Sequence, residues 1–430
     1  MSVSSTRRDF LRTSAVAGTG FWLASRSAQA LHGSPNEKLD IGVVGVANRG
    51  AANLAGVGGE NIVALCDVDE RHLGQAAGRF PGAKTYNDFR RMIDAEKLDA
   101  VVVCTADHTH AVVTLAALRA GCHVYCEKPL TRTVHEARLV AETAREEGLI
   151  TQMGTQIHAQ DNYRRVVELI RTGAIGSVSE VHVLCGKNWG GNGAPTGTFE
   201  VPDHLHWDLW LGPGAERPYN PAYHPANWRR YWAFGGGTLT DMACHYMDLP
   251  FWALDLHHPL SVEADGPEVN EHTAPAWLVV RYQFPRRGDR RELALTWWDG
   301  GHRPTERLAE FGLESWHNGI LFVGDGGWLI ADYSRLQLGP AADFEAFEAP
   351  EPFIPTSMGH HAEWIAACKE GGPTTCNFDY SGRLTETILL GAVAFRTGER
   401  LDWDAAKLEA RGCPAAEPFI RREAREGWEL

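Results

Sequence analysis

The chain lacks three features: an apolar run of membrane length after its first 30 residues, a Cys-x-x-Cys pair, and any repeat or low-complexity tract. The missing run excludes a membrane-spanning helix from residues 31–430. Positive charge is also scarce, because 41 Lys and Arg stand against 55 Asp and Glu, for a formal net charge of -14. This balance argues against nucleic acid and anionic membranes as partners. With 44% hydrophobic residues, the composition predicts a soluble globular protein of two domains.

Nine cysteines would suggest disulfides if the chain were exported. Five of them stand in or beside apolar, strand-like runs, where small buried thiols are common: Cys66, Cys104, Cys122, Cys126 and Cys185. We therefore expect core thiols, with one or two bridges left open.

The first 30 residues predict a twin-arginine (Tat) export signal. Arg7-Arg8 precedes a short apolar run, Ala15 to Ala24, and Ala28-Gln29-Ala30 supplies a small-x-small cleavage site. The alternative is an ordinary amphipathic N-terminus. On the export hypothesis the mature protein begins near Leu31 and is periplasmic, with no membrane attachment after signal removal. Because this route carries folded proteins, it also indicates a tightly held cofactor.

Strand and helix patterns alternate in the first half of the mature chain. Short apolar or β-branched runs predict four strands, at 39–46, 62–66, 100–104 and 122–126, and helical patterns occupy 51–57 and 111–120. Such alternation predicts a parallel sheet covered on both faces, in an α/β (Rossmann) domain that we place at residues 31–155.

Gly45-Val46-Ala47-Asn48-Arg49-Gly50 nearly matches the G-x-G-x-x-G turn between a strand and a helix. Its glycines permit a tight turn and close approach to a pyrophosphate, although Ala47 replaces the second one. Asp67 follows 22 residues after Gly45 at the tip of the second strand, where a carboxylate can bind the ribose hydroxyls and repel a 2'-phosphate. The turn and Asp67 predict NAD rather than NADP. Arg71 is the one residue nearby that favours NADP. The alternative for Asp67 is a helix N-cap.

Two loops at the carboxyl edge of this sheet carry further candidates. Thr105, His108 and His110 follow the third predicted strand, where ligands bind in open parallel sheets. A His-x-His pair lacks a third ligand nearby, so we expect no metal there but contacts to the nicotinamide half of a cofactor, or a cap for the next helix. After the fourth strand comes Glu127-Lys128-Pro129, which alone is often a surface turn. Lys128, at the end of a buried strand, is the candidate catalytic cation, and Glu127 and Lys128 are also expected to contact the cofactor.

The second half, residues 156–430, predicts an α+β domain with an open, mostly antiparallel sheet. Strand-like runs occur at 180–185, 277–284 and 292–298, and helical patterns at 162–171, 240–253, 361–369 and 384–395. Residues 186–225, rich in Gly, Pro, Trp and His, are too irregular for core and predict a substrate-side loop.

A second constellation follows the glycines at 235–237. Thr238 or Thr240 is expected as N-cap, which places Asp241 and His245 four apart on one helical face, where the carboxylate can steady the imidazole. The alternative is a capped helix with a half-buried histidine.

Taken together, the glycine turn, the acidic strand tip, the third-strand loop and Glu127-Lys128-Pro129 resemble the Gfo/Idh/MocA oxidoreductases, above all the exported, Tat-signalled bacterial members. The resemblance covers nearly all of residues 37–430. It implies a nucleotide-binding domain followed by an open sheet that often packs in oligomers, hence a homodimer or homotetramer. It also implies that Lys128 lies beside nicotinamide and substrate, with His245 as acid/base and Asp241 as its partner.

The function expected is hydride transfer between a sugar hydroxyl carbon and bound nicotinamide. His245 would take the hydroxyl proton, Lys128 would stabilise the oxygen and Asp241 would orient the site. Gln156 would contact cofactor; the candidate substrate contacts, aromatic or hydrogen-bonding, are His158, Trp189, Trp228, Arg229, Tyr231 and His245. Two alternatives stay open: a glycosidase that oxidises a sugar transiently without net redox, marked by an extra base such as His158 or Tyr231, and a non-catalytic NAD- or sugar-binding protein.

Overall fold

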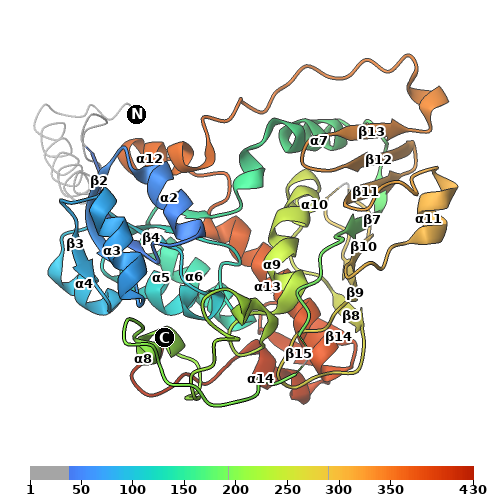
Figure 1. The fold of residues 1–430 in the computed structure, drawn as a ribbon. Helices are drawn as coiled ribbons and strands as arrows, with labels where there is room; N and C mark the ends of the chain where they lie inside the picture. Colours follow the sequence, from blue (N-terminus) through green and yellow to red (C-terminus); the bar gives the residue numbers. More distant parts are fainter. Residues whose placement is uncertain (1–37, 192, 289) are drawn as a thin grey trace, which may run out of the picture.

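The structure, a computed structural model, describes residues 38–191, 193–288 and 290–430. The predicted export signal lies outside these residues. Two sheets organise the chain, the first at the N-terminal, blue end and the second in the green-to-red part (Figure 1). Within the described part, no helix is long and apolar enough to cross a membrane.

The first sheet is wholly parallel, in the order β3-β2-β1-β4-β5-β6. Its strands are β1 (Asp40–Val44), β2 (Asn61–Cys66), β3 (Lys84–Tyr86), β4 (Ala100–Val103), β5 (His123–Cys126) and β6 (Thr151–Met153). Successive strands are added on one side of β1 up to β3 and on its other side from β4 onward, so the strand order reverses between β1 and β4, which pair side by side. In open parallel sheets, ligands bind beyond the carboxyl ends of the strands at such a switch point.

Helices cover both faces of this sheet, which is why its central strands are almost continuously apolar. One face packs against α2 (Arg49–Val57), α3 (Glu70–Arg79) and, from far along the chain, α12 (His360–Glu370). The other packs against α4 (Phe89–Ala95), α5 (His110–Arg119) and α6 (Val134–Glu146). Figure 1 shows α12 beside α2.

The second sheet has nine strands in the order β13-β12-β11-β7-β10-β9-β8-β14-β15, all antiparallel except the pair β7 and β10. They are β7 (Val178–Leu184), β8 (Ser261–Asp265), β9 (Val279–Phe284), β10 (Leu293–Trp298), β11 (Gly319–Gly324), β12 (Gly327–Ala331), β13 (Leu336–Gly339), β14 (Leu401–Asp404) and β15 (Glu409–Arg411). The predicted fold class, a parallel Rossmann sheet plus an α+β part with a mostly antiparallel sheet, is confirmed. The domain boundary at residue 155 stays a prediction.

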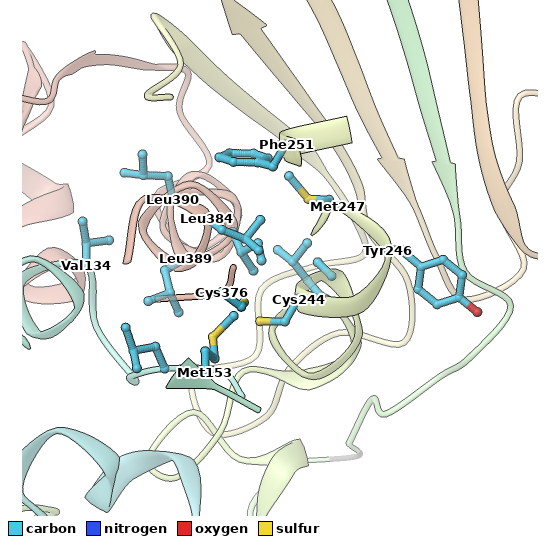
Figure 2. Packing of buried hydrophobic residues seen from close by; sticks show 14 of the residues in the cluster. Val134, Met153, Cys244, Tyr246, Met247, Phe251, Cys376, Leu384, Leu389 and Leu390 are labelled. Atoms are coloured by element: carbon cyan, nitrogen blue, oxygen red, sulfur yellow. The ribbon is translucent and has the colours of Figure 1, made fainter. Parts of the chain in front are cut away.

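Helices connect and cover this second sheet. They are α7 (Asp161–Arg171), α8 (Trp207–Leu211), α9 (Gly237–Tyr246), α10 (Asp248–Ala253), α11 (Thr305–Glu310), α13 (Phe378–Thr397) and α14 (Glu417–Ile420). Figure 2 shows leucines of α13 meeting Cys244 and Met247, with Met153 of the first sheet beside them. One apolar core therefore runs from the parallel sheet to α9 and fixes α9 against it.

Several element predictions were wrong or incomplete. The helix expected at 240–253 is broken at Met247 into α9 and α10, because Pro250 has no N–H and its ring excludes a carbonyl one turn earlier. Neither Thr238 nor Thr240 is the N-cap: α9 begins at Gly237, and the Thr238 hydroxyl instead accepts a hydrogen bond from the backbone N–H of Trp189 (2.8 Å).

The composition of residues 186–225 predicted a segment outside the core, and this prediction was wrong. With the segment that follows, they form an apolar cluster of their own: Leu205, Trp207, Trp210, Leu211, Tyr223, Trp228 and Phe234. All nine cysteines are unpaired, and eight of them are buried. Aromatic side chains rather than disulfides therefore hold this irregular region together.

Candidate active site

A cavity of about 740 Å³ lies at the carboxyl edge of the parallel sheet, where the second half of the chain covers it. The loops after β1, β2, β4 and β5 form one wall, and Gln156 follows β6. The start and first turns of α9 form the opposite wall through Asp241, Met242 and His245. The topology thus brings together segments from both ends of the described chain, from Val44 to Trp428.

The glycine turn after β1 is dictated by close packing. Gly45 has φ +83°, and a Cβ there would meet the carbonyl oxygen of Cys104 at 2.6 Å. A Cβ on Gly50 would lie 2.1 Å from the carbonyl oxygen of Gly45. Both positions therefore require glycine, whereas Ala47 and Asn48 line the cavity and tolerate side chains.

Asp67 lies at the end of β2 and lines the same cavity. Its carboxylate accepts hydrogen bonds from the backbone N–H groups of Val46 and Asp69, each at 2.9 Å. Burial raises the pKa of Asp67, and these two bonds oppose that rise. The N-cap alternative was wrong, because Asp69 is the residue that caps α3. Arg71 pairs with Asp69 at 3.4 Å and does not line the cavity.

The histidines after β4 are fixed by backbone carbonyls. His108 Nε2 lies 2.8 Å from the carbonyl oxygen of Trp210, and burial lowers the pKa of His108 to about 3. His110 Nδ1 lies 2.7 Å from the carbonyl oxygen of Pro129, and its Nε2 lies 3.1 Å from that of Thr105. Burial opposes charge on His110, yet its pKa is raised by Cys126 and these carbonyls. Through these three contacts the two histidines, which also line the cavity, position the loop that Thr105 begins, while His108 Nδ1 is buried without a partner among the described residues.

Arg49 and Glu127, both expected at the cofactor, pair with each other. Arg49 Nε lies 2.9 Å from Glu127 Oε1, which also accepts a hydrogen bond from the amide of Asn53 (2.8 Å). The ion pair ties the glycine turn to the end of β5. Both side chains still line the cavity, as does Gln156, whose Oε1 is buried without a hydrogen-bond partner in the described residues.

Lys128 and Asp241, which come from opposite walls of the cavity, are in direct contact. Lys128 Nζ lies 2.6 Å from Asp241 Oδ1 and 2.7 Å from the carbonyl oxygen of Asp241. Arg229 Nε approaches the same Oδ1 at 3.0 Å. Burial would raise the pKa of Asp241, but Lys128 and Arg229 lower it to about 2. The carboxylate is therefore ionised and holds two cations at one point.

His245 lines the cavity one helical turn after Asp241. Burial and then the charge of Lys128 lower its pKa to about 3, so the imidazole is neutral at physiological pH. The expectation that Asp241 steadies His245 by contact was wrong: the carboxylate turns to Lys128 and Arg229, and His245 Nδ1 is buried without a partner among the described residues. Asp241 acts on His245 only through its field, which favours the protonated ring.

The predicted substrate residues divide into two groups. Trp228 and Arg229 line the cavity. His158, Trp189 and Tyr231 do not. His158 is fully buried, with Nδ1 2.9 Å from both oxygens of Asp248 and its ring stacked on Trp252. Tyr231 packs its ring on Tyr223, and Trp189 lies beside Thr238.

Asp107 lies in the same loop as Thr105 and His108, but the sequence pattern did not identify it as a site residue. It is 2% exposed and lines the cavity, and its Oδ2 has no hydrogen-bond partner in the part of the chain described. Burial raises its pKa to about 7, although Arg229 opposes the rise. Proximity in the loop to Thr105 was the only signal in the sequence.

Two family models match the chain in succession. One, described as an oxidoreductase family with an NAD-binding Rossmann fold, matches residues 13–155, and one described as the C-terminal alpha/beta domain of an oxidoreductase family matches residues 164–290. Together they cover more than half of the sequence.

Similar proteins include sugar and cyclitol dehydrogenases. Inositol 2-dehydrogenase 2 of Saccharopolyspora erythraea is 34% identical over 34% of this chain and 44% of its own. D-glucoside 3-dehydrogenase of Escherichia coli is 27% identical over 47% of this chain and 49% of its own. The chain thus spans about half the length of the curated relatives it matches.

Solved structures share the fold at low identity. Aldose-aldose oxidoreductase from Caulobacter crescentus, complexed with glycerol, is similar with a TM-score of 0.58 at 20% identity, covering 85% of this chain and 100% of its own. Levoglucosan dehydrogenase, in complex with NADH and levoglucosan, gives 0.57 at 17% identity, covering 85% and 99%.

Proposed function

The chain belongs to the Gfo/Idh/MocA oxidoreductase family, and from this we propose that it oxidises a hydroxyl-bearing carbon of a sugar or sugar derivative with bound NAD. One observation carries the proposal: a single cavity contains both the glycine turn at Gly45 and the pair Lys128–Asp241, with His245 beside them. Cofactor and substrate groups thus share one space.

The residues at the glycine turn fit a dinucleotide. No Cβ can be accommodated at Gly45 or Gly50, and the turn meets the first helical residues as pyrophosphate binding requires. Gly45, Ala47, Asn48 and Asp67 would hold the adenosine and pyrophosphate half, while Thr105, Glu127 and Gln156 would lie along the rest. Bound NAD supplies the hydride acceptor. The carboxylate of Asp67 favours NAD over NADP because it repels a 2'-phosphate.

His245 is the base of the proposed reaction. It is neutral at physiological pH and has a buried ring nitrogen without a partner among the described residues, so it can accept the hydroxyl proton. Lys128 would donate a hydrogen bond to the same oxygen and stabilise negative charge that develops there. The Asp241 carboxylate holds the ammonium in place, with Oδ1 2.6 Å from Lys128 Nζ, and Arg229 Nε lies 3.0 Å from the same oxygen.

A carbohydrate substrate fits the remaining wall. Trp228, which is largely buried, lines the cavity, and the guanidinium of Arg229 lies over its ring, 4.2 Å from the centroid. Flat aromatic faces stack on the apolar faces of sugars, and Arg229 offers donors to hydroxyls. Relatives named for inositol and D-glucoside oxidation support the same class. The residues expected to mark a glycosidase, His158 and Tyr231, do not line the cavity, which favours net oxidation.

The decisive experiment uses the purified mature protein. Denaturation should release NAD(H), and addition of sugars and glycosides to the holoprotein should raise the absorbance of bound NADH for one class of substrate. Aglycone release without NADH accumulation would instead support transient oxidation. Failure to release or bind any nucleotide would overturn the scheme.

Export and assembly belong to the same proposal. A Tat signal at residues 1–30 would deliver the loaded protein to the periplasm, and the open second sheet offers a face for a homodimer or homotetramer. Cell fractionation after Arg7→Lys and Arg8→Lys substitution tests the first, and light scattering tests the second.

A further inference from the structure

A second cavity, of about 710 Å³, adjoins the first on the side of the large sheet. It lies between the end of β7 and three loops, at residues 301–303, 317–318 and 332–334. Lys187 and Tyr333 line both cavities. The Tyr333 ring lies 6.5 Å from that of His245, and the charge of Lys187 is among those that lower the His245 pKa. The two cavities therefore meet at Lys187 and Tyr333, close to His245.

This second cavity carries an excess of positive charge. Within the described residues, neither Lys187 nor Arg303 has a carboxylate partner, and both line the cavity. The only carboxylate among its described lining residues is Asp332, and Arg335 Nε neutralises it at 2.8 Å. Two cations thus remain without a counter-charge in a chain whose formal net charge is -14.

The cations are arranged to receive a ligand. Arg303 is anchored through Nη1, which donates to the carbonyl oxygen of Glu314 at 2.9 Å and lies 3.2 Å from His317 Nδ1. This leaves the rest of its fork of donors available to bind an anion. His302 stacks on Trp277, with ring centroids 4.0 Å apart, and gives the cavity a flat wall. A planar ring beside the anchored Arg303 and the exposed Lys187 suits a saccharide that bears an acidic group.

We propose that the second cavity binds a carboxylate, phosphate or sulfate on the substrate, so that the protein acts on an anionic saccharide. This proposal rests on the proposed oxidation, because it places the reacting hydroxyl at His245. Lys187 and Arg303 bind the anion, and the hydroxyl that is oxidised lies between Lys128 and His245.

Matched substrates test the charge requirement. The holoprotein is assayed for NADH formation with methyl glucoside against methyl glucuronide, and with glucose against glucose 6-phosphate and glucose 6-sulfate. At least one anionic member should exceed its neutral partner in kcat/KM by about tenfold, as charge-assisted hydrogen bonds give, and added salt should reduce this ratio. The preferred anion identifies the acidic group. Equal or better use of every neutral partner overturns the proposal.

Arg303→Ala and Lys187→Gln should each reduce the ratio of anionic to neutral kcat/KM by about tenfold. Arg287→Ala is the matched control, because Arg287 lines neither cavity and pairs with Asp255. An equal loss for both members of a pair would contradict the assignment.

Calorimetric titration of the NADH-loaded protein with D-glucuronate and with inorganic phosphate gives a readout independent of turnover. Binding that disappears in Lys187→Gln supports the anion site even if no sugar is oxidised, a result that would defeat only the proposed function. Binding unchanged in both variants defeats the anion site.

Discussion

Lys128 Nζ lies 2.6 Å from Oδ1 of Asp241, 113 residues later in the chain. The two side chains are 12% and 9% exposed. This pair joins the loop after β5, on the nucleotide side of the cavity, to α9, which the second half of the chain supplies. Removal of one partner from a buried ion pair costs about 3–5 kcal/mol, because it leaves the other charge without compensation. When Lys128 is the partner removed, Arg229 still compensates Asp241, so the fold can survive that loss.

Lys128→Ala should preserve nucleotide binding and reduce the rate of NADH formation by about 10²–10³, the effect of removing one oxyanion donor. Stopped-flow absorbance with saturating sugar measures the rate, and fluorescence titration measures nucleotide affinity. Lys369→Ala, which breaks the lysine–carboxylate pair that Lys369 forms with Glu60, is the control. A rate within a factor of about two of the parent would remove Lys128 from its assigned role.

Asp241→Asn should lower kcat by roughly 10–100-fold with little change in nucleotide affinity. The amide cannot neutralise Lys128 and Arg229, so the ammonium loses its anchor and the two cations repel each other. Steady-state kinetics separate kcat from KM. Asp265→Asn, at an exposed position, is the control and should change neither. A rise in KM alone would show that Asp241 binds substrate instead of positioning Lys128.

The lowered pKa of His245 predicts that the folded protein loses stability in acid. The pKa of His245 is about 3 in the folded protein against an ordinary 6.5, so the unfolded chain binds the proton first as the pH falls below 6.5. The free energy of unfolding should therefore decrease from pH 6.5 towards pH 3, by an amount on the order of a few kcal/mol from this group. His245→Asn should flatten that part of the curve in urea titrations at pH 7, 5 and 4. Parallel curves for the two proteins would show that His245 is not buried neutral.

The raised pKa of Asp107 predicts the opposite trend, a loss of stability as the pH rises. The pKa of Asp107 is about 7 when folded against an ordinary 3.8, so the folded protein favours the neutral acid. Stability from this group is complete below pH 3.8 and is lost as the pH rises through 7. Asp107→Asn should therefore raise the melting temperature relative to the parent at pH 8 and leave it nearly unchanged at pH 4. A difference that does not vary with pH would refute a buried, neutral Asp107.

Asp67→Ser should relax the preference for NAD over NADP by roughly tenfold, because it removes a negative charge that faces the 2'-phosphate. Competitive binding of the two nucleotides measures the ratio. Asp69→Ser tests whether charge alone matters, since Asp69 caps α3 nearby without lining the cavity. An NADP affinity that does not improve in Asp67→Ser would show that Asp67 only braces the turn through the N–H groups of Val46 and Asp69.

Some elements were predictable because their cause is local. The apolar strands, the turn at Gly45 and the end of β5 before Lys128 all follow from short patterns, and each lies where its pattern indicated. The hairpin of β11 and β12 could also have been predicted, since Asp325-Gly326 separates two apolar runs. Short strands such as β3 and β15, three residues each, carry no pattern long enough to detect.

The sequence by itself determined the parallel sheet, the nucleotide turn and the chemical types of the site residues, because backbone sterics and hydrophobic periodicity act over a few residues. Only the tertiary structure decided the partners. It turned Asp241 towards Lys128 and Arg229 instead of His245, withdrew His158 and Tyr231 from the cavity, and placed Asp107 and Lys187 at its walls. Which charges meet depends on how two sheets pack across a shared core, and residue spacing along one helix does not contain that information.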